Sequence, residues 1–130
     1  MSTPITAQSI YDTVLAHLRK QGVSSIERGV KDPSCMYRGP NNTSCAVGCL
    51  IPDKNYDFEM EHTSVDVAIV MLPKGYIKHL LLLTDLQNAH DYFMPAPKVG
   101  NNKQKLMAGW EEEMQKVAAT NQLIYTSLST

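Results

Sequence analysis

The first part of the chain carries apolar residues at every fourth position. This spacing, which begins at Ile10, places one apolar stripe on a helix surface and predicts an amphipathic helix from Pro4 to Gln21. Thr3 is a suitable cap before a proline at the first helical position. Gly22 can adopt the left-handed conformation that ends a helix.

A second apolar stretch, from Tyr76 to Phe93, is dense in leucine. The leucines recur at helical spacing, and Gln87 and His90 continue the same row of positions. The leucine density predicts that this helix is the central element of the core.

Two further helical segments flank this one along the chain. The segment from Lys103 to Thr120 carries apolar residues at helical spacing, and the apolar stripe that they form includes Trp110. A shorter segment begins at Thr63, where Asp66 three positions later resembles a capping box, and it ends at Pro73.

Residues 23–62 follow neither the helical nor the strand period, because turn-forming residues interrupt them repeatedly. Within this insert, Ser44 could cap a short helix from Cys45 to Ile51, although the apolar residues of this segment would suit a buried strand equally well. Cys35 to Arg38 could be extended. We therefore expect a mainly α fold: a single domain over residues 1–130, built as a compact bundle of three to four longer helices with an irregular, cysteine-containing insert. The alternative is an α+β fold with a short strand or hairpin in the insert.

The composition is that of a folded globular domain, with 130 residues, 43% hydrophobic and 19% charged. The net charge of -1, with no basic run longer than Arg19-Lys20, gives no indication of nucleic-acid binding. The apolar run around Leu80 to Leu83 is far shorter than the roughly 20 residues of a membrane span, and no leader is recognisable. We expect a soluble, cytoplasmic protein whose three cysteines are free thiols.

Cys45 is the sharpest candidate for a catalytic nucleophile. At the start of a helix, the helix dipole would lower the pKa of its thiol. His90 could then be the base, with Asp91 or Asp85 as the orienting carboxylate. The alternative, which we favour, is that Cys45 belongs to a seam of small residues and that His90 holds the insert against the leucine-rich helix. On this interpretation the protein is not an enzyme.

A metal site is a second possibility, because Cys45 and Cys49 stand one helical turn apart and Cys35 with His62 or His90 could complete four ligands. These spacings do not match the close cysteine pairs of structural zinc sites. We therefore expect neither a metal nor a cofactor.

Tyr37 and Arg38 precede a turn that contains Asn41 and Asn42, and together they resemble a recognition loop. A guanidinium there could hold a carboxylate or a phosphate of a partner or ligand. Arg38 could equally close the insert through an ion pair with one of three carboxylates: Asp53, Glu59 or Glu61.

Two other features could contact a partner. Asp57, Glu59 and Glu61 alternate with apolar residues and could offer a mixed surface to a basic partner, or form a solvated turn. Trp110 could anchor an interface or belong to the core stripe, and the proline-rich loop 94–97 could dock a partner or cover the core.

Short motifs are distributed over the insert and the leucine-rich helix. They are Cys35-x-Tyr37-Arg38-Gly39-Pro40, Cys45-Ala46-x-Gly48-x-Leu50-Ile51-x-Asp53, Tyr56, Glu59-Met60-Glu61 and Leu86-Gln87-x-x-His90-Asp91. In this combination, over roughly residues 10–91, the chain resembles a family of small, mostly uncharacterised proteins from bacteriophages and prophages.

The resemblance implies a phage-encoded accessory protein that binds a host protein in the host cytoplasm. Such a protein would act in host takeover or as an anti-defence inhibitor, for example of the anti-CRISPR kind, and it could self-associate through a helix face. Two alternatives come from the residues themselves. One is a small cysteine-dependent hydrolase or transferase that uses Cys45 and His90. The other is a nucleotide-binding sponge that uses Tyr37, Arg38 and the backbone amides near Asn41 to Ser44.

Overall fold

The structure is a computed structural model that describes residues 5–23, 25, 35–91 and 103–126. The α-helices among these residues are α1 (Ala7–Gln21), α2 (Val65–Ala68), α3 (Leu80–Asp91) and α4 (Lys103–Asn121). Short 3-10 helices lie between α1 and α3: η1 (Pro40–Asn42), η2 (Gly48–Leu50), η3 (Asp53–Asn55), η4 (Phe58–Met60), η5 (Ile69–Met71) and η6 (Lys74–His79). No helix in the described ranges is long and apolar enough to cross a membrane.

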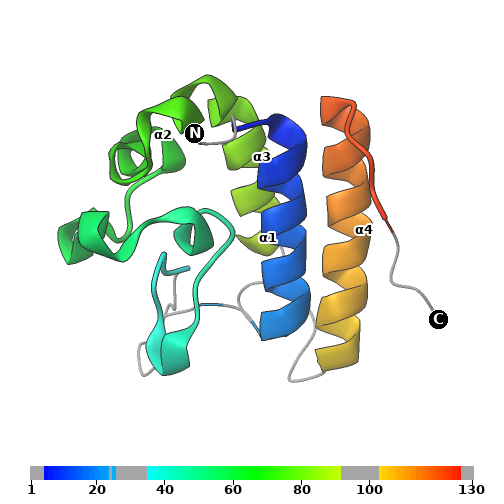
Figure 1. The fold of residues 1–130 in the computed structure, drawn as a ribbon. Helices are drawn as coiled ribbons and strands as arrows, with labels where there is room; N and C mark the ends of the chain where they lie inside the picture. The colour runs from blue at the N-terminus through cyan, green and yellow to red at the C-terminus, as the bar shows by residue number, and fades with distance from the viewer. Residues whose placement is uncertain (1–4, 24, 26–34, 92–102, 127–130) are drawn as a thin grey trace.

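The expected mainly α fold is confirmed. Helices α1, α3 and α4 lie side by side and contact one another, as Figure 1 shows. Their apolar stripes meet in one core, to which α1 contributes Val14, α3 contributes Leu83 and α4 contributes Met114. Tyr11 in α1 donates a hydrogen bond of 2.7 Å to the carbonyl of Met114, which joins α1 to α4 inside this core.

The α+β alternative is wrong for the part of the insert that the structure describes. The only pairing of extended backbone between described residues is a single antiparallel bridge of Arg38 with Ser44. Turns, 3-10 helices and irregular backbone make up most of the rest, because the many turn-forming residues leave no run long enough for a ladder.

The start of α1 differs from the prediction, whereas its end agrees. Thr6 is the cap, since its hydroxyl accepts the N–H of Ser9 (3.0 Å) and the hydroxyl of Ser9 accepts the N–H of Thr6 (3.1 Å). The predicted start at Thr3 and Pro4 lies outside the described residues. Gly22 ends the helix in the left-handed conformation, with φ of 66°.

Two other predicted helix starts are also displaced. The segment expected from Tyr76 begins as the 3-10 helix η6, and α3 starts only at Leu80, so that Ile77 is exposed. The capping box expected at Thr63 does not form, because the Thr63 hydroxyl donates to the carbonyl of Met60 (2.6 Å) and Ser64 precedes α2 instead.

The chain beyond α4 is attached to α1. Gln8 donates to the carbonyl of Ile124 (2.9 Å) and accepts its N–H (2.8 Å). Arg19 pairs with Glu111 of α4 at 2.6 Å and donates to the carbonyl of Thr126 (2.7 Å). The hydrogen bond from Arg19 lowers the pKa of Glu111, which marks a real ion pair between α1 and α4.

Glu61 holds the insert together from within. Its side chain is buried, and its carboxylate accepts the backbone N–H groups of Tyr37 (2.8 Å) and Arg38 (3.0 Å) and the hydroxyl of Tyr56 (2.5 Å). The prediction that Glu61 offers a partner-binding surface is therefore wrong, because its acceptor atoms are used inside the insert.

Gly48 permits the close approach on which this arrangement depends. A β-carbon at position 48 would lie 1.9 Å from the carbonyl oxygen of Tyr37, a distance that no side chain can occupy. The two halves of the insert, around Tyr37 and around Gly48, can therefore pack only with glycine here.

We predict that Glu61→Gln destabilises the fold by about 2 kcal/mol, because one of the three donors would then face an amide N–H₂ instead of an acceptor. Urea denaturation followed by circular dichroism measures the change. Glu59→Gln, at an exposed position two residues earlier, is the matched control and should change stability by less than about 0.5 kcal/mol. Equal stabilities of the two variants would contradict the role of Glu61.

Candidate functional site

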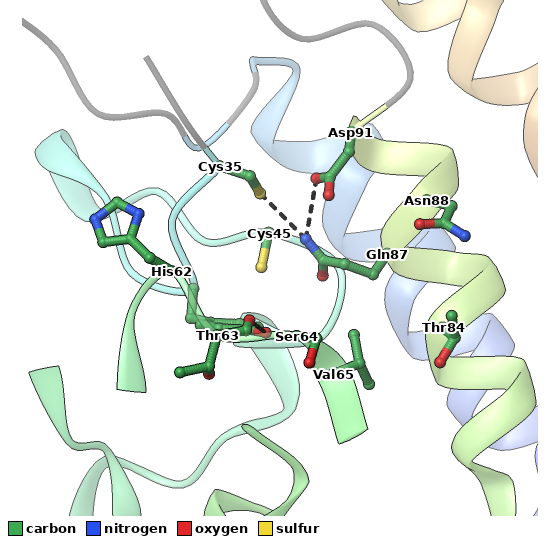
Figure 2. A pocket seen from close by; sticks show the side chains of 11 residues that line it. Cys35, Cys45, His62, Thr63, Ser64, Val65, Thr84, Gln87, Asn88 and Asp91 are labelled. Atoms are coloured by element: carbon green, nitrogen blue, oxygen red, sulfur yellow. Dashed lines mark hydrogen bonds between the residues drawn. The ribbon is translucent and has the colours of Figure 1, made fainter. Parts of the chain in front are cut away.

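A pocket of about 460 Å³ lies between the insert and α3. Figure 2 shows Cys35 and Cys45 on the insert side, with Gln87, Asn88 and Asp91 projecting from α3. The pocket is therefore lined by residues from the motifs that the sequence singled out.

Gln87 joins the two walls of this pocket. Its side-chain oxygen accepts the backbone N–H of Val47 at 3.0 Å. Its side-chain nitrogen donates to the sulfur of Cys35 (3.1 Å) and to Oδ1 of Asp91 (3.0 Å), the two dashed lines in Figure 2. One buried amide thus bonds the insert twice and α3 once.

His90 lies behind Gln87 with its ring fully buried against Trp110, at a centroid distance of 5.6 Å. Nε2 of His90 accepts the backbone N–H of Ser25 at 3.1 Å. Nδ1 lies 2.9 Å from Oδ1 of Asp91 and 3.3 Å from the sulfur of Cys35. Because Nε2 accepts a hydrogen bond, the proton of the neutral ring is on Nδ1, where it faces the carboxylate and the thiol.

The structure brings Cys35, and not Cys45, to the imidazole. Asp91 does contact His90, whereas Asp85 accepts a hydrogen bond from Asn121 (3.1 Å). Of the helix expected from Cys45 to Ile51, only the 3-10 helix η2 (Gly48–Leu50) forms, and a turn separates it from Cys45. Cys45 is fully buried, as the favoured structural alternative predicts. The prediction that a helix dipole activates Cys45 is therefore wrong.

The electrostatics of Cys35 oppose thiolate formation. A hydrogen bond with Cys45 and burial raise the pKa of the Cys35 thiol far above its usual value, and the negative charge of Asp91 raises it further. Burial likewise raises the pKa of Cys49 to about 12. All three cysteines are free thiols.

The donor atoms of Cys35, His90 and Asp91 lie within 4.8 Å of one another, so this group could be considered for a metal ion. A metal would need the lone pair of Nδ1, the nitrogen nearest to the other two donors. That atom carries the ring proton as long as Nε2 accepts the N–H of Ser25. The protonation of His90 therefore does not fit a metal at this position.

Two of the predicted partner-binding residues are inside the molecule. Tyr37 is 5% exposed and donates its hydroxyl to the carbonyl of Thr63 (2.5 Å). Trp110 is 2% exposed and lies in the buried stripe of α4, with its N–H 3.3 Å from the carbonyl of His90. The core alternative for Trp110 is confirmed, and its role as an interface anchor is wrong.

Arg38 pairs within the insert. Its guanidinium lies 2.7 Å from Oδ1 of Asp53, donates to the carbonyl of Ile51 (2.9 Å) and stacks over the ring of Tyr56 at 4.7 Å. The ion-pair alternative is thus the one that the structure contains, and a phosphate at Arg38 would have to displace Asp53.

The remaining predicted contact residues are at the surface. Asn41 and Asn42 are exposed, each with φ of 60°, and Glu59 is exposed beside Asp57, whose carboxylate accepts the Glu59 N–H (2.9 Å). The loop 94–97 lies outside the described residues.

Sequence reasoning considered Cys35 only as a possible metal ligand, not as the thiol that meets His90, and it gave Gln87 no role in the site. Gln87 had a usable signal, since it stands three residues before His90 on one helix face. The contact of Cys35 with His90 had no local signal, because only the path of the insert brings Cys35 to α3.

No protein-family model, no curated protein and no solved structure matches this chain. The likeness to phage proteins stays a prediction, and the chemistry of the pocket follows from its own geometry.

We predict that His90 holds its proton on Nδ1 at pH 7.5, because the N–H of Ser25 requires an unprotonated Nε2. Two-bond ¹⁵N–¹H correlation NMR of the imidazole rings distinguishes the two tautomers, with the exposed His62 as an internal reference. A proton on Nε2 would contradict the assignment and would reopen the metal interpretation.

Proposed function

We propose that the protein is a phage-type accessory protein that binds a host protein and does not use cysteine catalysis. The observation that supports this proposal is the protonation of the buried network. Cys35 is a thiol beside a carboxylate, and the nearest imidazole nitrogen already carries a proton.

A cysteine nucleophile needs a base that removes its proton or a positive charge that stabilises the thiolate. At Cys35 neither is in place, because Nδ1 of His90 is a donor and Asp91 brings a negative charge. The hydrogen bonds of His90 and Gln87 instead connect α3 to the insert. This network preorganises the walls of an open pocket, which is what a binding site requires.

The biological role that we attach to this binding comes from the motifs of the sequence. A small protein of this type would take hold of a host protein in the host cytoplasm and inhibit it, in takeover or anti-defence. The pocket would receive one side chain of that host protein, and the exposed turn at Asn41 and Asn42 is a further surface that could contact it.

A cysteine-dependent hydrolase or transferase is the second candidate, now centred on Cys35. It is favoured by the chain of contacts from Cys35 to His90 (3.3 Å) and from His90 to Asp91 (2.9 Å). In this case a bound substrate would have to reverse the electrostatics that now keep the thiol protonated.

Alkylation kinetics separate the two candidates. Because the pKa of Cys35 is raised, we predict that iodoacetamide modifies it at least about 10-fold more slowly in the folded protein at pH 7.5 than in urea. Since less thiolate is present below a raised pKa, the rate should climb steadily with pH up to pH 9. Peptide mass spectrometry assigns the modified residue. A fast rate with a plateau near neutral pH would support the enzyme instead.

We also predict that the tagged protein, expressed in a bacterial host, co-purifies with one host protein at a constant ratio. Cys35→Ser should retain this complex within about two-fold, because binding does not need the thiolate. Size-exclusion chromatography with mass spectrometry measures the ratio. A complex that accumulates only with Cys35→Ser, as expected when an enzyme cannot release its substrate, would contradict the proposal.

A further inference from the structure

Among the described residues, the lining of the pocket between the insert and α3 contains one carboxylate, that of Asp91, and no lysine or arginine. The side chain of Asp91 is 37% exposed, so its charge is accessible from the pocket.

The orientation of Asp91 is set by its neighbours. Nδ1 of His90 and the side-chain nitrogen of Gln87 both donate to the same oxygen, Oδ1, at 2.9 and 3.0 Å. Both donors are neutral, so they hold the carboxylate in place without cancelling its charge. In the part of the chain that the structure describes, no lysine or arginine pairs with it.

The hydroxyl groups of the pocket have already used their protons. Thr63 donates to the carbonyl of Met60 (2.6 Å), Thr84 donates to the carbonyl of Leu80 (2.9 Å), and Ser64 donates to the carboxylate of Asp66. Each oxygen is left with lone pairs only. The side-chain nitrogen of Gln87 is likewise engaged with Cys35 and Asp91.

The pocket is therefore rich in acceptors, with one carboxylate and three hydroxyl oxygens, and its lining also holds the amide of Asn88 and the imidazole of His62, shown as sticks in Figure 2. Guanidinium and ammonium groups are donors only and carry the opposite charge, so they complement such a lining.

We propose that this pocket binds the cationic end of an arginine or lysine side chain of the partner protein, with Asp91 as counter-ion and the hydroxyl oxygens of Thr63, Ser64 and Thr84 as acceptors. The inference rests on the proposed binding function and specifies its chemistry. The guanidinium, with five donors in a plane, can reach more of these acceptors than an ammonium with three.

The test is an NMR titration of the full chain with N-acetylarginine amide, N-acetyllysine amide and the neutral isostere N-acetylcitrulline amide. The arginine probe should give saturable shifts at Thr84, Gln87 and Asp91, and the citrulline probe should bind at least 10-fold more weakly. Equal binding of arginine and citrulline probes, or no saturable shift with either cationic probe, would overturn the proposal. A free diamine that binds at least 10-fold more tightly than both cationic probes would indicate a small-molecule ligand. This result would overturn the proposal that the cation belongs to a side chain of a partner protein.

Single substitutions test whether the probes bind in this pocket. Asp91→Asn keeps an oxygen for His90 and Gln87 and should weaken the arginine probe at least 10-fold. Asp12→Asn removes the same charge from the exposed face of α1 and should leave binding unchanged. Thr84→Val, which removes one acceptor and no charge, should weaken binding by a smaller factor. Circular dichroism melts identify any variant that fails to fold, and Thr84→Val then still tests the pocket.

The two proposals can fail separately. A host protein that co-purifies equally with the natural chain and with Asp91→Asn would overturn the cation pocket and leave the binding function standing. Saturable binding of the arginine probe without any host complex would support the pocket and count against the proposed function.

Discussion

The structure depends on the burial of two polar side chains, Gln87 and His90, on the face of α3 that meets the insert. A buried amide and a buried imidazole each cost free energy unless their atoms are hydrogen-bonded. The insert supplies those partners, with the backbone N–H groups of Val47 and Ser25 and the sulfur of Cys35. The polar groups of the insert and of α3 therefore satisfy one another's hydrogen bonds. Neither α3 nor the insert would be stable in this form alone, so we expect them to fold as one unit.

The same hydrogen bonds decide what chemistry remains at the surface. Because Ser25 occupies Nε2 of His90, the ring presents a proton to Cys35 and Asp91 instead of a lone pair. The imidazole is therefore neither a base nor a metal ligand in this state. The hydroxyl groups of Thr63 and Thr84 donate to backbone carbonyls, which leaves their oxygens with lone pairs only. Among the described residues, the network thus leaves a pocket rich in acceptors, with Asp91 as its one carboxylate.

The long helices were predictable because their signals are local. An apolar residue at every third or fourth position requires a helix that buries this stripe, and Gly22 ends α1 where it was expected. The helix starts were less predictable, since several hydroxyl residues compete for the cap: Thr6 caps α1, and Ser64 precedes α2. The catalytic alternative for Cys45 was wrong, because the seven residues from Cys45 form a turn and one 3-10 helix instead of a helix that starts at this residue.

Local sequence signals were enough to predict the helical class, the approximate positions of α1, α3 and α4, and the clustering of unusual chemistry in the insert and at the end of α3. Three features could be seen only in the folded chain: which thiol meets His90, the burial of Glu61, and the choice of Asp53 as the partner of Arg38. The difference lies in the range of the interactions. Helix periodicity and caps act over a few neighbouring residues, whereas the contact of Cys35 with His90 spans 55 positions and depends on the whole path of the insert.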